Sequence, residues 1–303
     1  MISHPTAYAF LVLNMALWGS TLVVARATHE IIPPLALAFW RWVVAVVVLL
    51  PFVWKKLPST RDYLRQSWRG LFVLCAAMVV GSTLAVVSVN YTTALNASLI
   101  NGSQPAITAL VAFIVVRERL APGRALGIAI AFLGIVVMIA QGQFEILRLM
   151  RFNAGDLVMV VAVLAWALYS VEVHRQENQP SSEVLLFFIA VCGLVGVFPP
   201  YLIETIYVRE FVPSWPGVAA IVYISFSASI LAVGLWNLAI RSVGPTRAAL
   251  FINLIPVFGA AFAMIFLRER LYLYHVAGAL LVFVGIFLAI RKREPSQPQR
   301  SAS

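Results

Sequence analysis

The sequence predicts an all-α polytopic membrane protein in which ten transmembrane helices form two inverted five-helix repeats. Three observations predict this fold. Of the 303 residues, 62% are hydrophobic and only 11% are charged, apolar runs of about 20 residues recur along the chain, and the second half of the sequence resembles the first. Ordinary soluble domains have roughly 45–50% apolar and about 25% charged residues. The composition therefore excludes a water-soluble enzyme or binding module.

Ten apolar spans emerge when the chain is read in windows of about 19 residues. They cover residues 6–28, 33–54, 69–89, 92–116, 123–141, 156–174, 184–205, 214–237, 245–267 and 273–290. We expect residues 1–141 to form the first repeat, 142–155 a connecting loop, 156–290 the second repeat and 291–303 a disordered tail. None of the connections is long enough to fold as a separate domain.

Basic residues are distributed unevenly between the two ends of these spans. If the N-terminus is cytoplasmic, fifteen Lys and Arg residues fall on the cytoplasmic side and six on the other side. The positive-inside rule therefore predicts that both termini are cytoplasmic. The formal charge of +10 is explained by this topology, so we expect no nucleic-acid partner.

An internal repeat appears when the sequence is shifted by 151 residues. PAITALVAFIVVRERL (105–120) then aligns with PVFGAAFAMIFLRERL (256–271), and 13 of the 36 positions from 104 to 139 are identical. Each half holds an odd number of spans, so the second half must be inserted in the opposite orientation. Inverted repeats of this kind are typical of transporters that alternate access to a site near the bilayer midplane.

Polar side chains form stripes on single faces of the first, fourth and eighth spans, as residues spaced at 100° on a helix do. Such faces contact protein or water rather than lipid. They line a substrate pathway, or they only join helices through hydrogen bonds of about 1 kcal/mol each. The stripes contain Asn14, Trp18, Thr21 and Thr28; Asn90, Ser98, Asn101 and Thr108; and Tyr223, Ser227, Gly234 and Asn237.

Two prolines, Pro105 and Pro256, are repeat mates near the middle of their spans. A proline inside a helix leaves the carbonyl four residues earlier without its hydrogen bond and kinks the helix. The freed carbonyls of Asn101 and Ile252, together with the side chains of Asn101 and Asn253, could accept hydrogen bonds from a substrate ammonium group. The alternative is a simple kink that binds nothing.

Aromatic and basic residues also lie deep in the spans. Trp18 and Trp166 correspond across the two halves and lie more than ten residues into their spans, so we expect them to line a cavity rather than to anchor the interface. Arg41 lies about 12 Å into the second span, where a cation is costly. It either binds a substrate carboxylate or extends towards the interface while it stacks on Trp40 and Trp42.

Acidic residues lie near the span ends, and no carboxylate or histidine is centred in a span. The sequence therefore predicts facilitated rather than proton-coupled transport, because proton relays usually need such groups. Glu118 and Glu269, in the two RERL segments, are expected to cap helix ends. Catalytic motifs such as HExxH and GxSxG are missing, and Cys75 and Cys192 lack a metal-binding spacing. We expect no enzymatic activity, no metal and no cofactor.

Small residues recur along the fifth and tenth spans, where they would let the two helices pack closely, within one chain or against a second copy. They are Gly123, Gly127, Ala131, Gly134, Gly278 and Gly285. The protein is therefore expected to be either a monomer or a homodimer.

Four segments carry a family resemblance: LWGSTLVVARA (17–27), PPLALAFWRW (33–42), the tract from Ala94 to RERLAPGRALGIAIAFLGIVV, and its copy ending FLRERLYLYHVAGALLVFVGIFL. The chain resembles the EamA-type exporters of the drug/metabolite transporter superfamily and is most similar to YddG-type amino-acid exporters, whose substrates include aromatic amino acids and methionine. The resemblance implies a bacterial inner-membrane protein in which spans five and ten lie outside a central cavity. Where that family often has Lys at the end of the first span, this chain has Arg26.

These observations together predict an inner-membrane carrier that exports neutral amino acids with aromatic or large apolar side chains by alternating access. An amino acid and the membrane lipid are the expected partners. The alternatives are an exporter of apolar cationic drugs, a carrier of nucleotide sugars or other phosphorylated metabolites, and a membrane-embedded enzyme or receptor. The predicted substrate-binding residues are Asn14, Trp18, Thr21, Arg41, Ser98, Asn101, Trp166, Tyr223, Ser227, Asn237 and Asn253. Either Arg41 or Tyr223 is expected to bind the substrate carboxylate.

Overall fold

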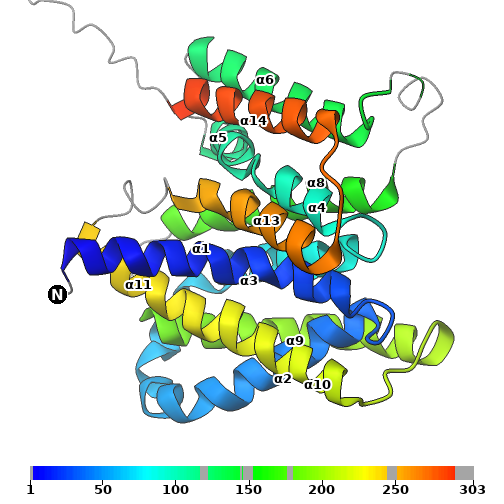
Figure 1. Ribbon diagram of the computed structural model, residues 1–303. Coiled ribbons are helices and arrows are strands. Elements are labelled where there is room, and N and C mark those ends of the chain that lie inside the picture. Colours follow the sequence, from blue (N-terminus) through cyan, green and yellow to red (C-terminus); the bar gives the residue numbers. More distant parts are fainter. Residues whose placement is uncertain are drawn as a thin grey trace, which may run out of the picture.

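The computed structural model describes residues 3–116, 122–143, 145, 153–175, 180–243 and 251–290, and within these ranges every regular element is helical. Figure 1 shows the helices gathered in one bundle, with α6 and α14 side by side at its upper edge. The α-helices are α1 (His4–Ala27), α2 (Pro34–Val53), α3 (Arg61–Ser88), α4 (Ala94–Asn101), α5 (Gln104–Val116), α6 (Pro122–Ile139), α8 (Ala154–Arg175), α9 (Ser182–Tyr207), α10 (Trp215–Ile224), α11 (Ala232–Val243), α13 (Ile255–Leu267) and α14 (Leu273–Ile290). Short or irregular helical segments are η1 (Trp54–Lys56), η2 (Pro58–Thr60), η3 (Ser225–Leu231) and η4 (Ile252–Leu254).

Five helices are long and apolar enough to cross a bilayer, and α4 with α5 would make a sixth span if this bent pair is counted as one. The five are His4–Ala27, Pro34–Lys56, Tyr63–Ser88, Ala154–Glu172 and Glu183–Tyr207. Shorter apolar helices cover Ala125–Met138, Trp215–Leu231, Val257–Leu267 and Leu273–Gly285. The all-helical fold is thus confirmed for the described residues, and five of its helices could span a membrane, whereas the number of ten spans stays a prediction.

Local sequence signals set where several helices begin. Ser3, Thr93 and Ser214 precede α1, α4 and α10, and the side-chain oxygen of each accepts a hydrogen bond from the backbone N–H three residues later. Such N-caps satisfy backbone donors that have no partner inside the helix. α1 and α10 also carry a proline in the first turn, where its missing N–H is not needed.

The two prolines predicted to kink their spans instead lie in the first turn of a new helix. α4 ends at Asn101 and α5 begins at Gln104, and the two helices are bent by 46°. The second copy has the same order, because η4 precedes α13 and Pro256 lies in the first turn of α13. A proline at the start of a helix costs no hydrogen bond. The side chains of Pro105 and Pro256 lie outside the described part of the structure.

Helix contacts follow a two-fold pattern. α1 packs against α11 and α13, and its repeat mate α8 packs in the same way against α3 and the α4–α5 pair. Two further contacts join repeat mates directly: α2 with α9, and α6 with α14. Exchanging the two predicted halves therefore maps each of these contacts onto another one or onto itself, as a pseudo-two-fold relation between the halves requires.

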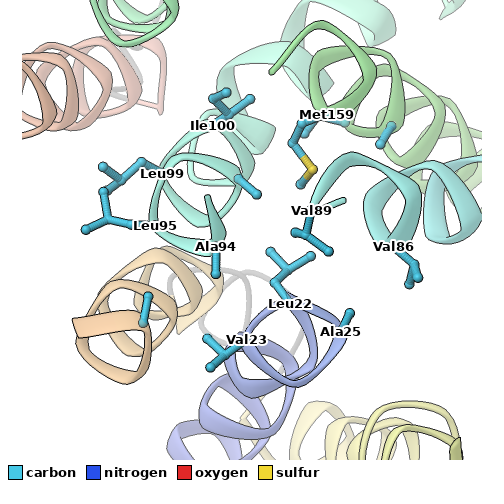
Figure 2. Close-up of a cluster of buried hydrophobic side chains, with 14 of the residues drawn as sticks. Leu22, Val23, Ala25, Val86, Val89, Ala94, Leu95, Leu99, Ile100 and Met159 are labelled. Carbon is cyan, nitrogen blue, oxygen red and sulfur yellow. The ribbon is translucent and has the colours of Figure 1, made fainter. Parts of the chain in front are cut away.

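Apolar side chains from α1, α3, α4 and α8 pack together where these helices meet (Figure 2). Leu22, Val86, Val89, Leu95 and Met159 are all buried there. Because lipid is as apolar as these side chains, close van der Waals packing rather than water exclusion supplies the stabilisation inside a bilayer. This cluster holds helices of both predicted halves together.

Glycines bring α6 and α14 into backbone contact, as the small-residue pattern predicted. A Cβ atom added to Gly134 would lie 2.6 Å from the carbonyl oxygen of Gly278, and one added to Gly285 would lie 2.5 Å from the carbonyl oxygen of Gly127. Neither site leaves room for a side chain. The two helices therefore depend on glycine for their separation.

We expect Gly134→Ala to lower the free energy of unfolding by about 1–3 kcal/mol, the usual cost of overpacking. The added methyl group would meet the backbone of α14, which cannot move aside as a flexible side chain can. Gly123→Ala, on the same helix, is the matched control because a Cβ there has no atom within 4 Å. Thermal unfolding in detergent measures the difference, and equal midpoints for the two variants would contradict the close packing.

Candidate functional site

A cavity of about 410 Å³ lies between helices of both predicted halves. Its walls combine aromatic, aliphatic and a few polar side chains, which is the usual composition of a small-molecule site. The lining residues are Trp18, Thr21, Leu22, Arg41, Trp42, Met78, Ser82, Ala85, Val86, Asn101, Gln104, Met159, Trp166, Tyr169, Ser170, Leu185, Leu186, Ile189, Ala228, Ser229, Trp236, Ile252 and Ile255.

Several residues predicted to bind substrate come together in this cavity. Trp18 and Thr21 reach it from α1, Arg41 from α2, Asn101 from the end of α4 and Trp166 from α8. Trp18 and Trp166 are the tryptophans that correspond across the two halves, and both line the same cavity. The side chains of Asn237 and Asn253, also predicted for the site, lie outside the described part of the structure.

Two other predicted residues, Asn14 and Ser98, are not among the lining residues. Asn14 is completely buried, and its amide donates a hydrogen bond to the carbonyl of Ala232 on α11. Ser98 is also fully buried, and it packs against the glycine at position 259 of α13 so closely that a Cβ atom there would overlap its side chain. Asn14 therefore joins helices through a hydrogen bond, which was the alternative interpretation of a polar stripe, whereas Ser98 contributes only packing, because its hydroxyl has no hydrogen-bond partner in the described part of the chain.

Tyr223, near the end of α10, and Ser227, inside η3, also lie outside the lining, and η3 accounts for the changed phase of the stripe after Tyr223. This segment is a π-helix, in which the N–H of Ala232 donates to the carbonyl of Ser227, five residues earlier. A π-turn holds more residues than an α-turn, so a constant 100° spacing does not hold across it. The cavity is lined by Ala228, Ser229 and Trp236 instead, while the Tyr223 hydroxyl lies 2.7 Å from the Ser20 hydroxyl.

Arg41 is 5% exposed and holds its charge inside the bundle. Its Nη2 atom donates a 3.0 Å hydrogen bond to the Ser82 hydroxyl, and its guanidinium carbon lies 4.5 Å from the centre of the Trp42 ring. No carboxylate of the described chain forms an ion pair with it. Of the two predicted arrangements, the observed one directs Arg41 to the cavity rather than to the interface.

The aromatic walls are held in place by neighbouring helices. The Trp18 indole N–H donates a 3.1 Å hydrogen bond to the carbonyl of Ala228, and the centres of the Trp18 and Trp236 rings are 5.8 Å apart. Trp166 meets Tyr169 edge to face at 5.6 Å. The Trp18 hydrogen bond therefore joins α1 to the π-helical segment η3.

Sequence reasoning missed several lining residues. Trp42 was considered only as a stacking partner for Arg41, although its place beside a deeply placed cation was the signal for the site. Trp236 belongs to the eighth span, but a periodicity analysis at 100° per residue does not place it on the cavity face, because the π-helix before it changes the angular spacing. Tyr169 and Gln104 lie three residues from Trp166 and Asn101, which is close enough to share a helix face.

At one end of the bundle, which we call the closed end, carboxylates cap the N-termini of neighbouring helices. Glu204 of α9 accepts hydrogen bonds of 3.2 and 2.8 Å from the first two backbone N–H groups of α2. Glu269, which follows α13, accepts bonds of 3.0 and 2.8 Å from the first two N–H groups of α4. Negative charge at a helix N-terminus is stabilising. The expected capping by Glu269 is confirmed, with the cap on another helix, whereas Glu118 lies outside the described residues.

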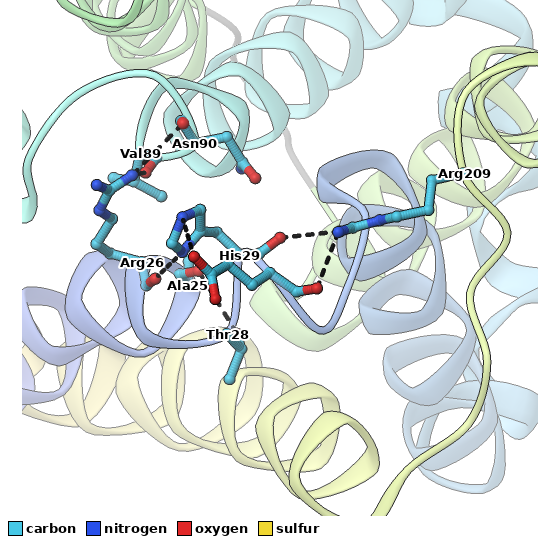
Figure 3. Close-up of polar contacts among 8 residues, drawn as sticks. Ala25, Arg26, Thr28, His29, Val89, Asn90 and Arg209 are labelled. Carbon is cyan, nitrogen blue, oxygen red and sulfur yellow. Dashed lines mark hydrogen bonds and ion pairs between the residues drawn. The ribbon is translucent and has the colours of Figure 1, made fainter.

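At the same end of the bundle, arginines bind backbone carbonyls that follow the C-termini of helices (Figure 3). Arg26 donates a 2.8 Å hydrogen bond to the carbonyl of Val89, and Arg209 binds the carbonyls of His29 and Glu30 at 2.8 and 2.9 Å. Cations at the carbonyl ends of helices complement the helix dipole. Arg26 follows the cavity residue Leu22 by one turn of α1, so these contacts lie just beyond the cavity.

Two similar helical halves around an internal cavity define a membrane transporter. The description "EamA-like transporter family" belongs to a family model that matches residues 5–140 and 153–291. The chain therefore belongs to this family, as its motifs predicted, and the two matches cover its two halves.

Relatives with similar sequences span almost the whole chain. A Bacillus subtilis (strain 168) protein described as the uncharacterized transporter YyaM is 28% identical over 291 residues, which cover 95% of this chain and 94% of the relative. Proteins of Salmonella typhimurium (strain LT2) and Escherichia coli (strain K12), each described as a probable amino-acid metabolite efflux pump, are 24% identical, and each match covers 92% of both chains. A crystal structure matches 95% of this chain and 97% of its own with a TM-score of 0.62 at 18% identity, which shows a shared fold.

Proposed function

We propose that this transporter exports neutral amino acids with aromatic or large apolar side chains across the bacterial inner membrane. The two halves would alternate access to the cavity by rocking against each other. The observation that carries the proposal is the combination of a tryptophan-lined cavity with one buried arginine, Arg41. The names of the Salmonella and Escherichia relatives, probable amino-acid metabolite efflux pumps, support export of compounds related to amino acids.

Each part of an amino acid has a partner in this proposal. Trp18 and Trp166 contact the apolar side chain, Arg41 binds the carboxylate, and Asn101 accepts a hydrogen bond from the amino group. Movement of the substrate to the far side of the membrane requires the contacts of Glu204, Glu269 and the arginines to separate, because they join the ends of helices just beyond the cavity.

The alternative substrate class, apolar cations, is disfavoured by the charge of Arg41. Two like charges in a cavity of low dielectric constant repel each other by several kcal/mol. Among the described lining residues there is no carboxylate that would offset this repulsion. Competition between a lipophilic cation and labelled phenylalanine distinguishes the two classes.

The decisive experiment is counterflow in proteoliposomes that are loaded with unlabelled amino acids and then supplied with labelled phenylalanine. We expect accumulation only when large neutral amino acids are inside, and at least about a tenfold lower rate for Trp18→Ala, because the variant loses an aromatic wall. Trp54→Ala is the matched control, since Trp54 is 68% exposed at the end of α2. Facilitated transport also requires that a protonophore leave the exchange rate unchanged. Folded protein that exchanges no amino acid would contradict the proposal.

A further inference from the structure

The cavity contains buried hydrogen-bond donors that have no acceptor. The Nε atom of Arg41 and the indole Nε1 of Trp42 are both buried, and neither has a hydrogen-bond partner in the described part of the chain. Both residues line the cavity. The guanidinium carbon of Arg41 lies 4.5 Å from the Trp42 ring centre, so the two groups belong to one site.

Unpaired buried donors are uncommon, because each one forgoes the hydrogen bonds that it makes in water. A buried cation without an anionic partner is costlier still, inside a membrane protein above all. A single anionic hydrogen-bond acceptor would neutralise the buried charge and satisfy both unpaired N–H groups. A planar carboxylate matches the donor geometry of a guanidinium group.

The described lining of the cavity offers an ammonium group no carboxylate. Arg41 is the one charged residue among the described lining residues. The buried carboxylates that the structure describes at the closed end already have partners: Asp156 binds Thr92 and Asn96, and Glu204 binds backbone N–H groups. An ammonium group in the cavity would meet only neutral acceptors, at a short distance from the Arg41 charge.

We propose that Arg41 and Trp42 form a carboxylate site that prefers amphipathic monoanions over zwitterions. The preferred ligand is a small carboxylic acid whose aromatic or branched apolar part stacks on the tryptophan walls and whose amino group is absent or acylated. This proposal rests on the proposed transport function of the same cavity and changes its substrate class from zwitterionic amino acids to related amphipathic monoanions. A volume of about 410 Å³ lies near the lower end of ligand pockets, which suits a single ring on a short chain.

A matched ligand series tests the proposal on the wild-type protein. 3-Phenylpropanoate, L-phenylalanine and 2-phenylethylamine share one carbon skeleton and carry the carboxylate alone, both charged groups, and the ammonium alone. Calorimetric titration of full-length protein in nanodiscs at pH 7 avoids the passive permeation that complicates flux measurements with weak acids. We expect 3-phenylpropanoate to bind at least about tenfold more tightly than phenylalanine, and 2-phenylethylamine not to bind.

Two variants assign the preference to its residues. Arg41→Gln should weaken 3-phenylpropanoate at least about tenfold and bring its affinity down to that of phenylalanine, because the charge that discriminates between them is gone. Trp42→Phe keeps a ring and removes only the unpaired N–H, so a smaller loss, about three- to tenfold, is expected for the anion. Trp236→Phe is the control, because it makes the same exchange elsewhere in the cavity lining and should leave the ratio between ligands unchanged.

The outcomes separate this proposal from the proposed function. Phenylalanine binding that is as tight as that of 3-phenylpropanoate, together with normal amino-acid counterflow, would overturn the preference for anions and leave amino-acid export standing. Loss of both binding and counterflow for all three ligands would overturn both proposals. If Arg41→Gln does not fold, the ligand series on the wild-type protein and on Trp42→Phe still decides the question.

Discussion

Replacing Asp156 by alanine is expected to lower the free energy of unfolding by about 3 kcal/mol, the largest loss that we predict for a single side chain outside the cavity. Asp156 is completely buried in the first turn of α8. One carboxylate oxygen accepts a 2.5 Å hydrogen bond from the Thr92 hydroxyl, and the Asn96 amide donates to both oxygens at 3.1 and 3.0 Å. The carboxylate thus fixes the start of α8 to the start of α4.

The size of the effect follows from what the substitution leaves behind. Alanine would remove a charged acceptor and leave the Thr92 hydroxyl and the Asn96 amide buried without it, and each such orphaned group costs about 1–3 kcal/mol. The surrounding junction is closely packed, since a Cβ atom at the neighbouring Gly155 would lie 2.6 Å from the carbonyl oxygen of Ser88. This close backbone contact leaves little space at the junction.

Thermal unfolding in detergent measures the loss, and a decrease of roughly 5–10 °C in the midpoint corresponds to it. Asp156→Asn is the isosteric control and should be affected less, because it retains one carbonyl acceptor. Thr92→Val should cost clearly less in the Asp156→Ala background than in the wild type, since the hydrogen bond is already lost there. Additive effects of the two substitutions would contradict the direct contact.

The helical membrane fold could be read from the sequence, because composition and apolar run length depend on the solvent rather than on tertiary detail. The glycines of α6 and α14 were also predictable, since their spacing places them on one helix face. The break at Gly102 and Ser103 was not, because a proline in the sequence is compatible with a kink inside one helix and with the start of a second helix. Only the structure distinguishes the two.

The site was predictable where residues correspond across the repeat and unpredictable where helix geometry changes. Trp18 and Trp166 were found because they are repeat mates at a depth that interfacial tryptophans do not reach. Trp236 and Ser229 were missed because η3 is a π-helix, and no periodicity rule predicts one from sequence. The stripe through Ser227 assumed a regular helix, so its phase was wrong beyond the π-turn.

Gly193→Ala is expected to weaken the binding of phenylalanine at least about tenfold, although residue 193 is not a lining residue. A Cβ atom at this position of α9 would lie 2.6 Å from two ring atoms of Trp42. Trp42 is 1% exposed and belongs to a buried apolar cluster that also contains Ala38, Ala45 and Ile189. The ring therefore has to move towards the cavity that it lines, and the Arg41 guanidinium stacked near it has to move as well.

Gly196→Ala provides the control on the same helix, because a Cβ atom there would have no atom within 4 Å. Both substitutions raise helix propensity by about 1 kcal/mol, so a difference between them reports the contact with Trp42 and not the helix itself. Titration with phenylalanine in nanodiscs compares their affinities, and a tenfold loss corresponds to about 1.4 kcal/mol, within the usual cost of overpacking. Equal affinity for the two variants would mean that the Trp42 ring can yield without changing the cavity, and the carboxylate site would then not depend on where α9 holds that ring.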